Sequence, residues 1–148
     1  RNVLVLNPNF ANAHAELGRA LIDVGQFGAA IAQIEKAIAL SPTDISIYMW
    51  YYFGGLAALH AGDHQSALDW LRKSHQANRV HDSTLRLMAV ALAGTGREDD
   101  AREKIREFLK LRPDATLDDW KRPNARRHPA VVARWRAGKT PYGALPLA

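Results

Sequence analysis

The six histidines of this chain are the residues whose chemistry would allow metal binding or acid–base catalysis. Imidazole is a common zinc ligand and transfers protons near neutral pH. His60 and His64 are four residues apart, but Gly62 and Asp63 between them favour a turn, so the two rings do not share a helix face. The other four are scattered along the chain: His14, His75, His81 and His128. We therefore expect no metal site.

Other kinds of catalytic site have no support in the sequence either. The Gly94–Gly96 segment is interpreted as a turn between helices, not as a loop that cradles phosphate, and no serine, histidine and aspartate spacing indicates a nucleophile. The chain has no cysteine, which excludes disulfides and thiolate ligands and favours a reducing, cytoplasmic compartment. No apolar run approaches the roughly 20 residues that cross a membrane. We expect no catalytic residues, no cofactor and no enzyme activity in this fragment, whereas a missing N-terminal domain could be catalytic.

The positive charge of the chain is concentrated at its C-terminal end. Residues 1–115 contain 13 Lys/Arg and 13 Asp/Glu, so the net charge of +5 comes from residues 116–148. Arg134, Trp135 and Arg136 combine cations with an aromatic ring, a combination that could contact phosphates and stack on a base. The alternative is a terminal cap, in which Trp135 anchors a helix that begins at Pro129. We favour a basic capping segment over 114–148 and consider nucleic-acid binding the weaker alternative.

The helices that would position a functional site recur at a regular interval along the chain. One spacing occurs three times, and the second and third copies are 34 residues apart. The copies are Gly25, Ala30, Ile34, Ala37, Pro42; Gly62, Ala67, Leu71, Ser74, Arg79; and Gly96, Ala101, Ile105, Phe108, Pro113. A fixed period of this size is typical of stacked helical hairpins.

Each copy divides into two helices of about 14 residues. In the first copy Gly25 suits the left-handed residue that ends a helix, and small residues at Gly18 and Ala30 allow paired helices to approach closely. The predicted hairpins cover 9–42, 43–79 and 80–113, and residues 1–8 are interpreted as the end of a truncated preceding repeat.

The second hairpin differs most from the common pattern. Its first helix, expected over 45–61, carries aromatic residues at 48, 50–53 and a glycine pair at 54–55. A helix that is apolar on all sides is either covered by its neighbours or exposes a binding edge. In the third hairpin, Asp82 or Ser83 is the expected N-cap of the first helix.

These spacings resemble those of tetratricopeptide repeats over about residues 1–113. Arg79 and His14 depart from the family pattern, which has proline and tryptophan at those places. The resemblance implies an all-α, right-handed superhelix of helical hairpins with C-terminal capping helices. The segments 118–122, 129–138 and 143–146 resemble the C-terminal ending of bacterial signalling proteins that join such repeats to a class III adenylate or guanylate cyclase-type domain.

The resemblance also implies that the first helices line a concave groove. The side chains expected there are Asn12, Ala15, Arg19, Ile22, Asp23, Met49, Tyr52, Leu56, Leu59, His60, Ser83, Arg86, Val90 and Ala93. We expect partner binding at five of them: Arg19, Met49, Tyr52, Leu56 and Arg86. For Leu56 and Leu59, packing on adjacent helices is an equal alternative. Of the places that form the family's carboxylate clamp, only Arg19 holds a suitable residue, which argues against that ligand.

The sequence thus predicts a protein–protein interaction module, within a larger bacterial signalling or regulatory protein, that captures a peptide or a helix. Its partner would be a protein or peptide, with a homodimer possible in principle. One alternative is a structural or dimerising array coupled to a cyclase or another output domain. The other is nucleic-acid contact through the basic tail.

Overall fold

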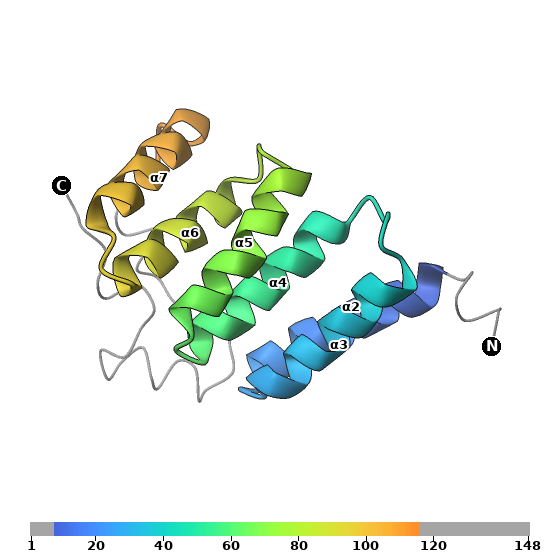
Figure 1. Ribbon diagram of the computed structural model, residues 1–148. Coiled ribbons are helices and arrows are strands. Elements are labelled where there is room, and N and C mark those ends of the chain that lie inside the picture. Colours follow the sequence, from blue (N-terminus) through green and yellow to red (C-terminus); the bar gives the residue numbers. More distant parts are fainter. Residues whose placement is uncertain (1–7, 116–148) are drawn as a thin grey trace.

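All regular secondary structure in the computed structural model, which describes residues 8–115, is helical (Figure 1). The six helices are α2 (Pro8–Asp23), α3 (Phe27–Leu40), α4 (Ile47–His60), α5 (His64–Ala77), α6 (Asp82–Gly94) and α7 (Glu98–Leu111). No strand occurs in residues 8–115. The predicted all-α class with helical hairpins is therefore confirmed. Of the predicted end of a preceding repeat (residues 1–8), residues 1–7 lie outside the described residues and Pro8 begins α2. Residues 116–148 of the predicted capping segment (114–148) also lie outside the described residues.

The helices pack as three consecutive hairpins. α2 packs on α3, α4 on α5 and α6 on α7, while α3–α4 and α5–α6 contacts join one hairpin to the next. The first helices also touch in succession, α2 with α4 and α4 with α6. Two layers result, one of α2, α4 and α6 and one of α3, α5 and α7, and the second layer faces the viewer in Figure 1. The molecule therefore has two different faces on which a ligand could bind.

The three hairpin turns share one backbone geometry. Gly25, Gly62 and Gly96 have φ values of 82°, 84° and 82°, in the left-handed region that glycine adopts without a steric penalty. In each turn the residue after the glycine donates its N–H to the carbonyl five residues earlier, at 2.9 Å. This bond satisfies a carbonyl that the end of the helix leaves unpaired. The expected left-handed position at Gly25 is confirmed, and the same turn closes all three hairpins.

Glycines inside helices mark where helices approach closely. A Cβ atom added at Gly18 would lie 2.8 Å from Cγ1 of Ile34 and 3.1 Å from the carbonyl oxygen of Ala30. These separations are shorter than van der Waals contact, so α2 and α3 require glycine at this point. The expected close approach at Gly18 and Ala30 is confirmed.

The aromatic helix α4 is largely covered by its neighbours. It runs from Ile47 to His60, slightly shorter than the predicted 45–61, and Trp50, Phe53 and the segment 57–60 are buried. Two apolar clusters, one on each side of α4, share Tyr52, Leu56 and Trp70 as partly buried borders. The helix is thus the centre of the core, and only part of its surface remains available to a partner.

The start of α6 corrects the predicted cap. The helix begins at Asp82, its N-cap is His81, and neither Asp82 nor Ser83 occupies that position. The Asp82 carboxylate instead accepts a hydrogen bond from Arg112 at 3.0 Å. This ion pair joins the start of α6 to the end of α7, and it holds the pKa of Asp82 below its usual value against the opposing effect of burial.

Candidate functional site

The layer of first helices contains the predicted groove residues, and the structure divides them into two groups. One group is buried in the core and is not available to a partner: Ala15, Ile22, Leu59, His60 and Val90, each no more than 5% exposed. Ala15, Ile22, His60 and Val90 were expected to line the groove, and that expectation was wrong; for Leu59 the alternative of packing on adjacent helices is confirmed. They are buried where α2, α4 and α6 pack on the second helices and on one another.

The other group includes Met49, Tyr52 and Leu56, which lie along one side of α4. Their spacings of three and four residues place them one turn apart on the same helix face. All three are partly buried and pack against the apolar cluster that α4 forms with α2 and α3. Each side chain is therefore held on its inner side by the core, and its remaining surface is accessible.

His81 connects α4 to the start of α6 at this surface. Its ring meets Tyr52 edge-on with 5.1 Å between ring centroids, and Tyr48 at 5.3 Å. Burial lowers the pKa of His81, the positive charge of Arg86 lowers it further, and Asp82 opposes both effects. His81 is thus flanked by Tyr52 and by the charge of Arg86, two of the residues that the sequence predicted.

A short hydrogen-bond chain fixes the position of His81. Its Nδ1 lies 2.7 Å from the hydroxyl of Thr84, which lies 2.9 Å from the hydroxyl of Ser74, and Ser74 donates to the backbone carbonyl of Tyr48 at 2.9 Å. Ser74 and Thr84 are fully buried. A buried polar chain of this kind is rigid because every member needs its partner, so it locks α4, α5 and the start of α6 together.

The predicted residues outside α4 differ in their surroundings. Arg86 is partly buried, and its positive charge helps to lower the pKa of His81. Arg19 is exposed on α2 and forms ion pairs with Glu16 at 3.2 Å and Asp23 at 3.5 Å on its own helix. The structure therefore places Tyr52 in contact with His81, whereas the ion pairs of Arg19 remain within α2. The role of His81 was missed, because a histidine in a loop gives no periodic signal in the sequence.

Three other histidines of the described part of the chain contact neighbouring helices or loops. His14 hydrogen-bonds Gln33 at 2.6 Å between α2 and α3, and His60 stacks on Phe27 with 5.6 Å between ring centroids. The ring of His64 packs against Gly94. Within residues 8–115, no three histidine, aspartate or glutamate side chains are grouped as metal ligands.

The stacked helical hairpins define a helical-repeat scaffold. Comparison with known proteins supports the same fold. Residues 15–79 match the tetratricopeptide repeat family, whose repeats generally mediate protein–protein interactions rather than catalysis. The crystal structure of MamA is similar with a TM-score of 0.67 and 22% sequence identity, over 93% of this chain and 74% of that chain. At this identity the likeness shows the fold alone. A sequence comparison with curated proteins gave no match.

The family match ends at residue 79. Among residues 8–115, no helix combines the length and the apolar character that crossing a membrane requires.

Proposed function

We propose that this chain is a protein–protein interaction module that captures a peptide or a helix of a partner on the face of α2, α4 and α6. Met49, Tyr52 and Leu56 form the apolar centre of the proposed surface, Arg86 borders it, and Arg19 contributes a charge from α2. The observation that carries the proposal is the row of partly buried apolar side chains on α4, each packed on the core along one side.

The physical argument is that the surface is formed before the partner arrives. The ring of Tyr52 is already held between His81 and Phe53, at centroid distances of 5.1 and 6.0 Å. Binding therefore costs little side-chain entropy at this position. Tyrosine, methionine and arginine are also enriched at the centres of protein interfaces. An amphipathic helix would place apolar residues on α4 and an acidic residue beside Arg86.

The test is to select binding peptides from a displayed library with the 148-residue chain, and then to measure the affinity of variants for one selected peptide. Tyr52→Ala should weaken binding by more than about tenfold, as expected for a central interface residue. Tyr51→Ala is the matched control, because Tyr51 lies on the same helix but packs toward Trp70 at 6.3 Å. Equal affinity of Tyr52→Ala and the unmodified protein would contradict the assignment of this face.

We further propose that the module belongs to a larger signalling or regulatory protein of the bacterial cytoplasm. Support comes from the resemblance of its C-terminal segments to cyclase-linked repeat proteins and from the lack of cysteine. A dimerising array is the competing function, and it predicts a molecular mass that rises with concentration in sedimentation experiments. A constant monomer mass together with peptide capture would favour the interaction module.

A further inference from the structure

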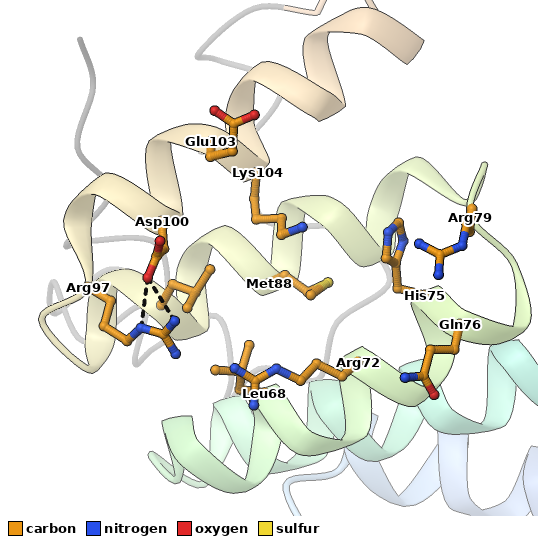
Figure 2. A pocket seen from close by; sticks show the side chains of 11 residues that line it. Leu68, Arg72, His75, Gln76, Arg79, Met88, Arg97, Asp100, Glu103 and Lys104 are labelled. Carbon is orange, nitrogen blue, oxygen red and sulfur yellow. Dashed lines mark hydrogen bonds and ion pairs between the residues drawn. The ribbon is translucent and has the colours of Figure 1, made fainter.

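A cavity lies on the opposite layer of the molecule, between α5 and α7 and above α6 (Figure 2). Its volume is about 400 Å³, within the range of roughly 300–1,000 Å³ that is usual for small-molecule sites. The floor is apolar and consists of Leu68, Met88 and Leu92. Met88 and Leu92 lie on the side of α6 that faces away from Arg86, so this cavity is separate from the face described above.

The rim of the cavity carries several cations. Arg72 and Arg79 come from α5 and the loop after it, and Lys104 comes from α7 with its ammonium group directed into the hollow (Figure 2). The two acidic side chains of the lining are already paired, Asp100 with Arg97 at 2.7 Å and Glu103 with Arg106 at 2.8 Å. The positive potential of the rim is therefore only partly neutralised.

Arg79 distinguishes this hairpin from the other two. Pro42 and Pro113 stand at the corresponding places of the first and third hairpins. Within residues 8–115, Arg79 takes part in none of the ion pairs, whereas Lys104 pairs with Glu107 at 3.0 Å and Arg72 with Asp69 at 3.8 Å. A cation thus replaces the proline at the one hairpin end that borders the cavity.

His75 lies between these cations. Its Nδ1 atom is buried and has no hydrogen-bond partner among the described residues, although buried polar atoms in folded proteins nearly always have one. Burial lowers the pKa of His75, Lys104 and Arg79 lower it further, and Glu107 has the opposite effect. The ring therefore lies in a positive field, and its Nδ1 atom has no hydrogen-bond partner among the described residues.

We propose that this cavity binds a small phosphate monoester, whose phosphate contacts Arg79, Lys104 and His75 and whose apolar body rests on Met88 and Leu92. A phosphate group has several acceptor oxygens that point in different directions, and the rim offers donors from α5, α7 and the α5–α6 loop. At pH 7 a phosphate monoester carries a charge of about −1.5 to −2. The ester would neutralise the charge of Arg79, which forms no ion pair within residues 8–115, and would place a negative charge beside the ring of His75.

The test uses phenyl phosphate as the probe and the NMR signals of the histidine rings as the readout, with the His75 signal assigned by its loss in His75→Asn. Phenyl phosphate should shift the His75 signal saturably and raise the pKa of His75. At equal ionic strength, inorganic phosphate should bind at least about threefold more weakly, because it lacks the body that covers the apolar floor.

Variants separate the proposed site from general attraction of anions. Arg79→Gln and Lys104→Gln should each weaken binding by about threefold or more, whereas Lys36→Gln, on the exposed side of α3, should leave it unchanged. Circular dichroism confirms that each variant is folded. The proposal is overturned if the shift does not saturate, if Lys36→Gln weakens binding as much as Lys104→Gln, or if inorganic phosphate or phenol binds as tightly as the ester.

Discussion

Gly55 in the middle of α4 provides the sharpest test of how these helices pack. Replacing glycine with alanine inside a helix stabilises it by about 1 kcal/mol through propensity alone. At Gly55, however, a Cβ atom would lie 2.6 Å from both Cγ and Cδ2 of Leu71, a residue that is fully buried. Overpacking of this kind costs roughly 1–3 kcal/mol. We therefore expect Gly55→Ala to destabilise the protein by about 1 kcal/mol net, despite the better helix former.

The matched control is Gly28→Ala on α3, where an added Cβ meets nothing within 4 Å. This variant should gain up to about 1 kcal/mol, so the same chemical change should have opposite signs at the two positions. Urea unfolding followed by circular dichroism measures both free energies of unfolding. A double-mutant cycle with Leu71→Val adds a second criterion, because a shorter side chain should reduce the cost of Gly55→Ala. A Gly55→Ala protein that is as stable as Gly28→Ala would refute the close approach of α4 and α5.

Two further predictions concern the hydrogen-bond chain beside α4. Ser74→Ala removes the donor to the Tyr48 carbonyl and one partner of Thr84, so it should lower the free energy of unfolding by about 1–2 kcal/mol. Ser66→Ala on the same helix, as the control, should change it by less than about 0.5 kcal/mol. Because the folded-state pKa of His81 is lowered, the unfolded chain takes up the proton first as the pH falls. Stability should therefore decrease as the pH drops through the unfolded value near 6.5. Urea midpoints at pH 7.5 and 5.5 should differ less in His81→Gln than in the unmodified protein, and an equal difference would contradict this assignment.

Much of the fold followed from short-range patterns. The repeated spacing predicted the hairpins because each copy has a glycine, Gly25, Gly62 or Gly96, at the place where a helix ends. The left-handed backbone conformation that ends a helix favours glycine. Gly18 and Ala30 predicted a close approach for a similar reason, since only small side chains leave room for it. Such requirements act on single residues, so they are visible in the sequence.

The sequence did not predict which of the expected groove residues are buried. Leu59 and Val90 have the same apolar character as Leu56, but they are buried while Leu56 is only partly so. The difference depends on where α5 and α6 cross α4, and a helical period does not specify those crossings. The N-cap of α6 was likewise assigned to the wrong residue: α6 begins at Asp82, whose carboxylate pairs with Arg112, 30 residues away in the chain.

The sequence by itself therefore determined the repeat, the turn residues and the helical class, because these depend on local backbone geometry and on the 3.6-residue period. Only the tertiary structure decided which side chains remain accessible, that His81 packs against Tyr52, and that Arg79, His75 and Lys104 line one cavity. These relations bring together residues from helices that are distant in the chain. They arise from the packing of three hairpins against one another, which no single repeat encodes.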